Sequence, residues 1–190
     1  MRNIGIYGGT FDPIHHAHLI LAREALEQLD LERVIFVPAA MSPHKLDEKS
    51  TAPALRLEML RAALEGEERF TIDERELQRP SPSFTIDTIE ELARANPDRK
   101  LFCLIGSDNV AGLSTWQRID DLRRLVEFVV LDRGGGAAPD PGCISIHRPI
   151  NISSTEIRNR VANGLSIRYL VPPAVEDLIR RHHLYRTSHK

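Results

Sequence analysis

The residues whose types and spacing best support chemistry lie near the N-terminus, between an apolar run and a helical pattern. The segment reads Gly8-Gly9-Thr10-Phe11-Asp12-Pro13-Ile14-His15-His16-Ala17-His18. Two adjacent glycines allow a tight turn and a close approach of the backbone to a ligand. The helix that follows begins with free N–H groups and the positive end of its dipole. His15 and His18 are three residues apart, so both rings can face one ligand. This arrangement predicts a site for a phosphate chain, although a tight turn with incidental histidines would use the same residues.

Other kinds of site do not fit this spacing. A Walker P-loop needs a Lys after its last glycine, and no Lys follows Gly8 and Gly9 here. A dinucleotide-binding turn needs G-x-G-x-x-G, which the segment lacks. A zinc site would need a third ligand, and Cys103 and Cys143 form neither a C-x-x-C pair nor a zinc-like spacing with histidines. We therefore expect neither a disulfide scaffold nor a metal held by the protein itself.

A second candidate site lies near the other end of the chain, at Ile152-Ser153-Ser154-Thr155-Glu156-Ile157-Arg158. Ser153 and Glu156 have capping-box spacing, the two isoleucines occupy staple positions, and Gly164 suits the residue after the helix. Ser154 and Arg158 are four residues apart, so a hydroxyl and a guanidinium share one face beside the helix start. Because Arg holds phosphate oxygens with a planar fork, the segment predicts an anion site. A capped surface helix with a solvated arginine would have the same pattern.

Apolar runs that read as strands alternate with amphipathic helical patterns, and these elements must position both segments. The strand candidates are Ile4–Tyr7, Val34–Val37, Phe70–Ile72, Leu101–Ile105, Phe128–Leu131 and Ile144–Ile146. Helical stripes run over Ala22–Leu29, Leu57–Leu64, Ile86–Ala93 and Val175–His182. The alternation predicts an α/β fold with a doubly wound, Rossmann-like, mostly parallel sheet and helices on both faces. Ligands of such sheets bind beyond the carboxyl ends of the strands.

Composition sets further limits. The chain has 190 residues, of which 42% are hydrophobic and 27% charged, with a formal net charge of -2. We expect a single domain over residues 1–190, since no linker or repeat interrupts the pattern. The net charge gives no overall positive potential that would attract nucleic acid. No apolar run approaches the ~20 residues of a membrane span, and the N-terminus lacks the pattern of a secretory signal. We expect a cytoplasmic protein without nucleic-acid or membrane partners, and the sequence leaves homo-oligomer formation open.

The two end segments together resemble the signatures of the HxGH nucleotidylyltransferase superfamily. G-G-T-F-D-P followed by H-x-x-H is similar to bacterial nicotinate-mononucleotide adenylyltransferases, and the segment from Ile152 resembles the I-S-S-T-x-I-R signature. In that family the second signature holds the ATP phosphates from the side opposite the histidines. The resemblance covers essentially the whole chain. It departs at Ala17, where the family has Gly, and we expect the added methyl to narrow the backbone approach to a phosphate.

Three middle segments resemble the family's acceptor site. Ser42-Pro43-His44-Lys45 is similar to its P-P-H-K loop. Ser83-Phe84-Thr85 is similar to its S-Y-T sequence, with Phe84 in place of Tyr and with Thr85 as a helix N-cap near the nicotinate carboxylate. Gly106, Asp108 and Trp116 match I-G-x-D…L…W, in which Trp stacks on the pyridine. Each also has an ordinary structural reading, as a solvated loop, a helix cap and a half-buried aromatic.

The resemblance implies transfer of the adenylyl group of ATP to nicotinate mononucleotide, giving nicotinate adenine dinucleotide and pyrophosphate in NAD biosynthesis. Mg²⁺ is expected to enter bound to ATP. The implied catalytic residues are His18, His15 and Arg158. The implied ATP site comprises Gly8, Gly9, Thr10, Phe11, His15, His18, Gly106, Asp108, Ser153, Ser154, Thr155 and Arg158. The implied mononucleotide site comprises His44, Lys45, Phe84, Thr85, Asp108 and Trp116.

Two alternatives remain at this point. The acceptor could be nicotinamide mononucleotide or another phosphate, such as phosphopantetheine, although Phe84-Thr85 and Trp116 favour a pyridine nucleotide. A catalytically silent nucleotide sensor is a different class of protein, and the presence of His15, His18 and Arg158 argues against it.

Overall fold

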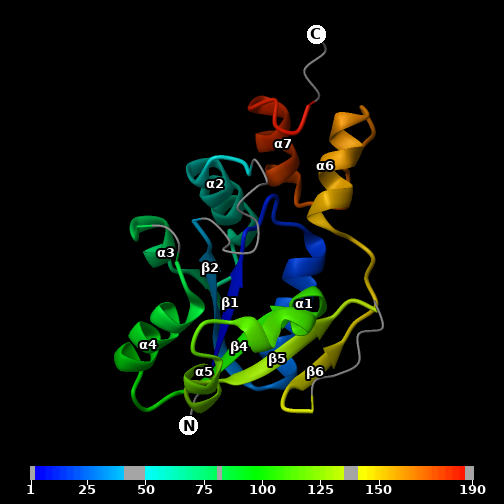
Figure 1. Cartoon of the computed structure of the whole chain (residues 1–190). Helices are drawn as coiled ribbons and strands as arrows, with labels where there is room; N and C mark the ends of the chain where they lie inside the picture. The colour runs from blue at the N-terminus through cyan, green and yellow to red at the C-terminus, as the bar shows by residue number, and fades with distance from the viewer. Residues whose placement is uncertain (1–2, 41–49, 81–82, 135–140, 187–190) are drawn as a thin grey trace.

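A single parallel sheet organises the computed structural model, which describes residues 3–40, 50–80, 83–134 and 141–186. Six strands lie in the order β3-β2-β1-β4-β5-β6, and every neighbouring pair is parallel (Figure 1). The strands are β1 (Asn3–Gly9), β2 (Leu31–Pro38), β3 (Phe70–Ile72), β4 (Lys100–Gly106), β5 (Glu127–Asp132) and β6 (Ile144–His147). The strand order changes direction at β1, which lies between β2 and β4, so the crevice beside its carboxyl end is where a ligand is expected.

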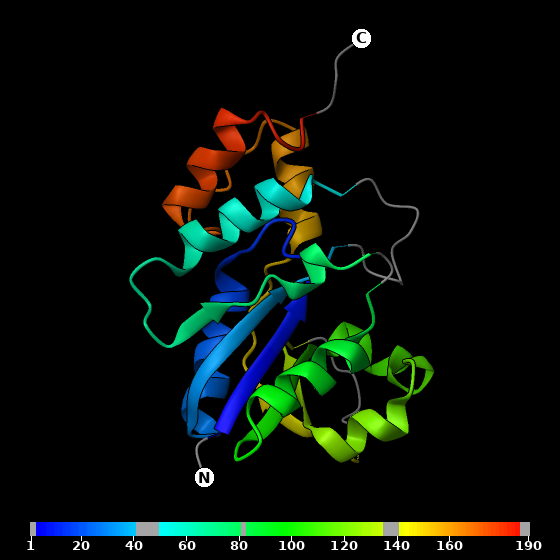
Figure 2. The same ribbon diagram turned by 90° about the vertical axis from the view of Figure 1, so that its left-hand side faces the viewer.

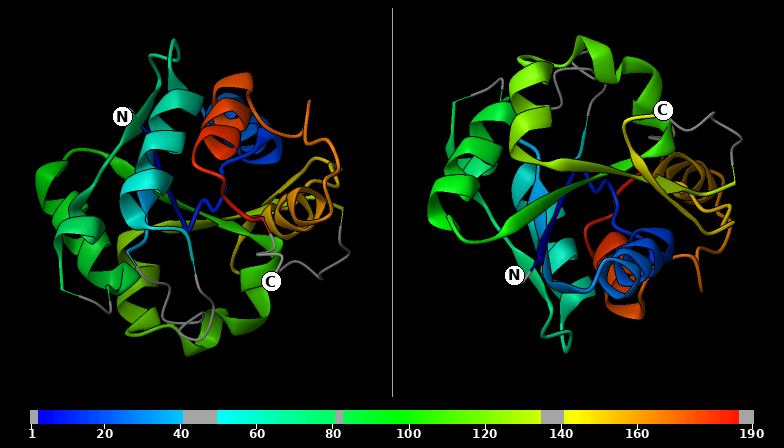
Figure 3. Two further views of the ribbon diagram at one scale, coloured as in Figure 1. Left: turned by 90° about the horizontal axis from the view of Figure 1, so that it is seen from above. Right: turned by 90° about the horizontal axis from the view of Figure 1, so that it is seen from below.

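Helices cover both faces of this sheet, as Figure 2 shows with β1 and β2 between α1 and α4. One face packs against α1 (His16–Gln28), α2 (Pro53–Leu64), α6 (Ser154–Ala162) and α7 (Pro173–Arg181). The other face packs against α4 (Thr85–Ala95), the 3₁₀ helix η1 (Ser107–Thr115) and α5 (Ile119–Leu125). The short helix α3 (Arg75–Gln78) contacts β2. Seen from above in Figure 3, α2, α6 and α7 gather over one end of the sheet.

The core lies on both sides of the strands, which explains their almost wholly apolar sequences. In β4, Phe102 and Leu104 face the helices of the α1 side, whereas Leu101, Cys103 and Ile105 face the α4 side. Successive side chains of a strand point to opposite faces, so a strand buried on both faces has no polar side. The predicted doubly wound sheet is confirmed, and all six predicted strands are present.

The predicted helical stripes need two corrections. In α2 the predicted Leu60 and Leu64 are buried, but Leu57 is only half-buried and Arg56 is fully buried. Arg56 can be buried because its guanidinium bonds three backbone carbonyls inside the protein. His182 caps the end of α7 in an exposed position and does not extend the apolar stripe. The helices α3, η1 and α5 were not predicted, since four to nine residues, or a 3₁₀ repeat, carry too little of the 3.6-residue pattern.

None of the helices in the described ranges is both long enough and apolar enough to span a membrane.

Candidate active site

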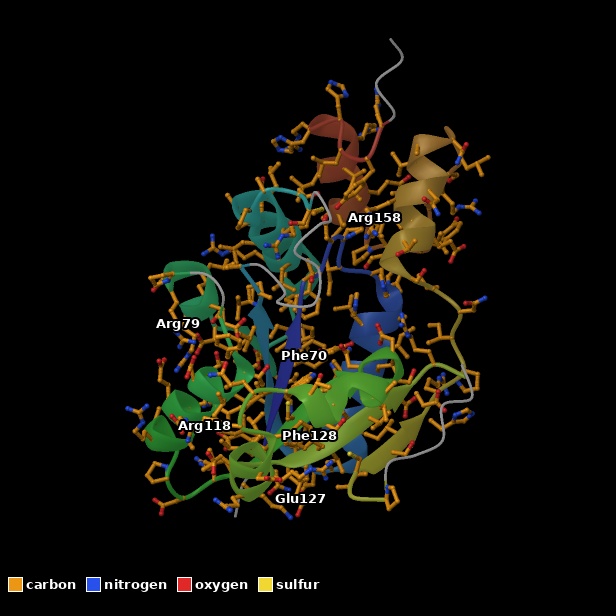
Figure 4. The ribbon with its side chains drawn as sticks, in the orientation of Figure 1. Phe70, Arg79, Arg118, Glu127, Phe128 and Arg158 are labelled. Atoms are coloured by element: carbon orange, nitrogen blue, oxygen red, sulfur yellow. The ribbon has the colours of Figure 1, made fainter. Side chains whose placement is uncertain are left out.

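A cavity of about 720 Å³ opens at the carboxyl ends of β1, β4 and β5. Its walls come from the turn after β1, the starts of α1, α4 and α6, and the 3₁₀ helix η1. This volume lies within the range of about 300–1,000 Å³ that small-molecule sites occupy. Figure 4 places Arg158 beyond these strand ends and Glu127 at the opposite end of β5.

The two glycines after β1 have different tasks. A Cβ on Gly8 would meet nothing within 4 Å, so the backbone there is open to the cavity. A Cβ on Gly9 would lie 2.9 Å from the ring of Phe11, which packs back over the turn. Gly8 therefore leaves room for a ligand, whereas Gly9 makes room for the protein's own Phe11.

His15 and His18 form a stacked pair at the start of α1, with ring centroids 3.7 Å apart. His15 N–H donates to His18 Nδ1 at 3.3 Å. A neutral imidazole that accepts at Nδ1 carries its proton on Nε2, so His18 keeps an N–H donor. His15 is only 1% exposed, and its side chain faces the backbone N–H of His18 in a capping-box arrangement. Neither ring nitrogen of His15 makes a hydrogen bond of ordinary geometry in the described part of the chain.

Burial keeps both imidazoles uncharged. It lowers the pKa of His15 to about 3, with the positive charge of Arg133 acting in the same direction. Burial, His15 and Arg133 hold the pKa of His18 well below its usual range. A neutral imidazole still donates one N–H, and a buried unpartnered ring is costly unless a ligand supplies the partner. The pair is thus prepared for an acceptor such as a phosphate oxygen.

The start of α6 carries the caps that the sequence predicts. Ser153 Oγ accepts from Glu156 N–H at 3.1 Å, and Gly164 follows the helix with a φ of 69°. Ser154 Oγ donates to Pro13 O at 2.9 Å, and Arg158 Nη1 donates to Asp12 O at 2.9 Å. These two hydrogen bonds join the predicted anion segments, 141 and 146 residues apart in sequence, into one site.

The Asp12 carboxylate holds the turn in place from the other side. It accepts from Thr51 N–H at 2.9 Å and from the Tyr185 hydroxyl at 2.5 Å. Burial and the neighbouring Asp12 carboxylate raise the pKa of Tyr185 above its usual range, so the hydroxyl keeps the proton that it donates. The local sequence marks Asp12 only as part of a turn, and it gives no signal for Tyr185.

Arg56 is a second supporting residue that sequence reasoning missed. Its side chain is fully buried and donates to Thr10 O at 2.7 Å, Thr51 O at 3.0 Å and Ala40 O at 3.1 Å. One guanidinium thus fixes the turn after β1, the end of β2 and the start of α2. An Arg inside an amphipathic helix normally lies on the solvated face, so nothing in the local sequence marks this one as buried.

The start of α4 corrects one expectation. Phe84, with extended backbone, occupies the N-cap position, and Thr85 is the first helical residue, so Thr85 is not the cap. No side chain caps this helix. Both residues nevertheless line the cavity, and the N–H groups of the first turn lie at its edge.

The end of β4 supplies the remaining predicted residues. A Cβ on Gly106 would lie 2.4 Å from Asp108 Oδ1, so the glycine leaves room for that carboxylate in its present position. Trp116 is half-buried with its ring edge-on to Phe128 at 6.1 Å. Asp108 and Trp116 both line the cavity.

The cavity brings together most of the predicted site residues. Those that line it are Gly8, Gly9, Thr10, Phe11, His15, His18, Phe84, Thr85, Gly106, Asp108, Trp116, Ser153, Ser154, Thr155 and Arg158. His44 and Lys45 lie outside the described residues. Ala17 is fully buried and is not among the lining residues. Arg133 and Glu76 also line the cavity and were not predicted.

Within the described residues, no cluster of three or more His, Cys, Asp or Glu side chains is arranged to hold a metal ion. Mg²⁺ often keeps water and phosphate ligands rather than a protein cage.

Comparison with known proteins gives a consistent family. Residues 6–160 match the family described as cytidylyltransferase-like. A "probable nicotinate-nucleotide adenylyltransferase" of Shouchella clausii is 46% identical over 97% of this chain and 97% of its own length. The protein of the same description from Geobacillus thermodenitrificans is 46% identical over 99% of this chain and 89% of its own length.

Solved structures agree on the fold. The Plasmodium falciparum nicotinic acid mononucleotide adenylyltransferase complexed with NaAD has a TM-score of 0.79 at 23% identity, covering 97% of this chain and 98% of the other. The same protein complexed with APC has a TM-score of 0.77 at 22% identity, with the same coverage. At this identity the likeness concerns the fold, whereas the sequence matches establish the family. This chain therefore belongs to the cytidylyltransferase-like family of nucleotidyltransferases and, within it, to the nicotinate-nucleotide adenylyltransferases.

Proposed function

We propose that this chain transfers AMP from ATP to nicotinate mononucleotide, releasing pyrophosphate and forming nicotinate adenine dinucleotide. The observation that carries the proposal is the pair of hydrogen bonds from Ser154 and Arg158 to the backbone of Pro13 and Asp12. They bring two helix starts, the His15 and His18 rings and an arginine to one cavity, as a polyphosphate ligand requires. Both ring nitrogens of His15 lack a hydrogen-bond partner there among the described residues. The names of the curated relatives support the same reaction.

In the proposed reaction, an oxygen of the mononucleotide 5′-phosphate attacks the α-phosphorus of ATP. The new bond joins that oxygen to the α-phosphorus, and the bond to the bridging oxygen of the β-phosphate breaks as pyrophosphate leaves in line. The attacking phosphate is already ionised near neutral pH, so no strong general base is needed. Alignment and charge neutralisation supply the catalysis, as in other phosphoryl transfers.

We assign His18 and His15 to the oxygens of the α- and β-phosphates. The Nε2–H of His18 and the unpartnered ring of His15 are available for this contact. Arg158, with the N–H groups at the start of α6 near Ser154, holds the β- and γ-phosphates. The open backbone at Gly8 lets the phosphate chain approach closely.

The acceptor binds on the α4 side of the cavity. The ring of Trp116 stacks on the pyridine, and the N–H groups at the start of α4, beside Phe84 and Thr85, meet the nicotinate carboxylate. Asp108 accepts from ribose hydroxyls. His44 and Lys45 are proposed to counter the attacking phosphate on the resemblance alone. Mg²⁺ is proposed to enter bound to ATP, where it neutralises phosphate charge.

The test is an acceptor panel with ATP and, in separate reactions, nicotinate mononucleotide, nicotinamide mononucleotide and phosphopantetheine. Pyrophosphate release and product mass are measured. We expect nicotinate adenine dinucleotide as the main product. A main product from another acceptor would reassign the substrate, and ATP binding without pyrophosphate release from any of the three would indicate a nucleotide sensor.

A further inference from the structure

Two residues with permanent positive charge line the cavity in the part of the chain that the structure describes, Arg158 and Arg133. Arg133 directly follows β5 at the carboxyl edge of the sheet. Its Nη1 donates to Ile152 O at 3.2 Å, and its Nη2 lies 3.8 Å from Asp108 Oδ1. The side chain is therefore held between the end of β4 and the segment that opens α6.

The guanidinium of Arg133 has donors to spare. A guanidinium carries five N–H donors, and the contact with Asp108 is longer than a hydrogen bond. The side chain is 28% exposed, and it borders the same cavity as the buried, unpartnered ring of His15. A ligand that enters the cavity thus meets a fixed cation with unused donors beside a neutral donor pair.

The need for such a cation follows from charge. A triphosphate is polyanionic near neutral pH, whereas burial keeps His15 and His18 uncharged in the free protein. The charge of Arg133 itself contributes to lowering the pKa of both rings, which shows that it acts at the position of the histidines. The other cation, Arg158 on α6, already donates hydrogen bonds to Asp12 O and to Thr155 Oγ1.

We propose that Arg133 is a further phosphate-binding residue, whose guanidinium contacts the triphosphate of ATP together with His15 and His18. The proposal rests on the proposed function only in taking ATP as the ligand. Two other roles are physically reasonable for this side chain. It could stack on the adenine base, or it could serve only to tie Ile152 to the sheet edge.

The experiment measures binding of three probes without an acceptor: ATP, inorganic tripolyphosphate and adenosine, by calorimetry at one fixed Mg²⁺ concentration. The variants are Arg133→Gln and Arg133→Lys. The matched control is Arg124→Gln, which removes the same charge from a side chain that is 76% exposed on α5. Unfolding temperatures are recorded for every variant.

We expect Arg133→Gln to weaken tripolyphosphate and ATP at least tenfold, about 1.4 kcal/mol, with adenosine affinity unchanged. Arg133→Lys should recover part of the loss, since it restores charge but not the fork, and Arg124→Gln should change nothing. Unchanged tripolyphosphate affinity in Arg133→Gln would overturn the proposal. In that case, weaker adenosine binding would indicate that Arg133 stacks on the adenine base. A lower unfolding temperature alone would indicate that Arg133 only holds Ile152 at the sheet edge. An equal loss in Arg124→Gln would also overturn it, as a general charge effect. Because no acceptor is present, failure of the proposed reaction would leave this comparison intact.

Discussion

The two sides of the cavity are built differently. On the phosphate side, the turn after β1 is held by hydrogen bonds from Arg56, Ser154, Arg158 and Tyr185. On the acceptor side, the start of α4 has no side-chain cap, and Trp116 has an edge-on contact with Phe128. A step that depends on alignment gains from fixed donors, whereas recognition of a flat ring needs a surface to stack on. We therefore expect the phosphate side to determine turnover and the acceptor side to determine selectivity between acceptors.

The largest effect is expected from removing the buried support of the phosphate side. Arg56→Met leaves three carbonyl oxygens without their donor and removes the cation near Asp12, so unfolding free energy should fall by about 3–5 kcal/mol. Urea unfolding measures this. The control is Arg61→Met on the same helix, whose side chain is 60% exposed and pairs with Glu74, and which should cost less than about 1 kcal/mol. Equal losses in the two variants would mean that Arg56 has no special structural role.

The next effect concerns turnover. His18→Ala removes a preorganised donor to the reacting phosphates, so kcat should fall by about 10²–10³ while mononucleotide affinity changes little. Steady-state kinetics with both substrates measure this. His16→Ala is the matched control, because His16 is two positions away and does not line the cavity. Near-normal turnover of folded His18→Ala would remove His18 from the chemical step.

Low pH should destabilise the phosphate side. Because the pKa of His15 is lowered to about 3 in the folded state, the unfolded chain binds a proton below about pH 6.5 that the folded chain does not. Stability is therefore lost as pH falls through that value and continues to fall towards the folded pKa, by up to about 1.4 kcal/mol per pH unit for each such histidine. Urea unfolding between pH 7 and pH 5 measures the slope.

His15→Phe should flatten that slope, because it removes the ring that stays unprotonated in the folded protein. An unchanged slope in His15→Phe would show that His15 takes up its proton in the folded state. Bound ATP should also flatten the slope, since phosphate oxygens favour the protonated ring.

A smaller loss is expected at the start of α6. Arg158→Lys keeps the charge but loses the planar fork, so ATP affinity and rate should each stay about tenfold below wild type. Arg160→Lys is the control on the same helix, since Arg160 bonds Ser166 O away from the cavity. Full activity of Arg158→Lys would rule out a two-pronged phosphate contact.

The smallest effect is expected on the acceptor side. Trp116→Ala should weaken both pyridine mononucleotides by about 0.5–1.5 kcal/mol, because stacking does not distinguish a carboxylate from a carboxamide. The wild type should prefer the acid by about tenfold or more, since the amide leaves an N–H donor at the start of α4 unpaired. Measured kcat/KM for both acceptors should therefore fall together, with their ratio preserved. If the ratio of the two kcat/KM values fell to about one in Trp116→Ala, selectivity would depend on Trp116 and not on the start of α4.

Sequence reasoning was strongest where local pattern determines structure. The six strands were predictable because burial on both faces leaves uninterrupted apolar runs, and the Ser153 cap because its spacing is specific. The helix η1 was not predictable, since a 3₁₀ segment lacks the 3.6-residue repeat. Thr85 was misplaced by one residue because Phe84 takes the extended N-cap backbone without a capping side chain.

The residues that support the turn after β1 and the start of α6 could not be predicted from the sequence, for a different reason. Arg56, Arg133 and Tyr185 act through partners far away in sequence, and the residues around each of them carry no motif. Two of these residues would normally be assigned to a solvated surface. Only the folded arrangement shows that Arg56 bonds three separate segments.

The hydrogen bonds to Asp12 also affect how the protein is made. Its backbone oxygen is bonded by Arg158 and its carboxylate by Tyr185, which lie 146 and 173 residues later in the chain. During synthesis Asp12 leaves the ribosome well before these two partners, because translation adds about 5–20 residues per second. A partly synthesised chain therefore lacks a finished nucleotide site. Closing contacts of this separation is also slow, so a complete nucleotide site requires a folded chain that has been synthesised at least as far as Tyr185.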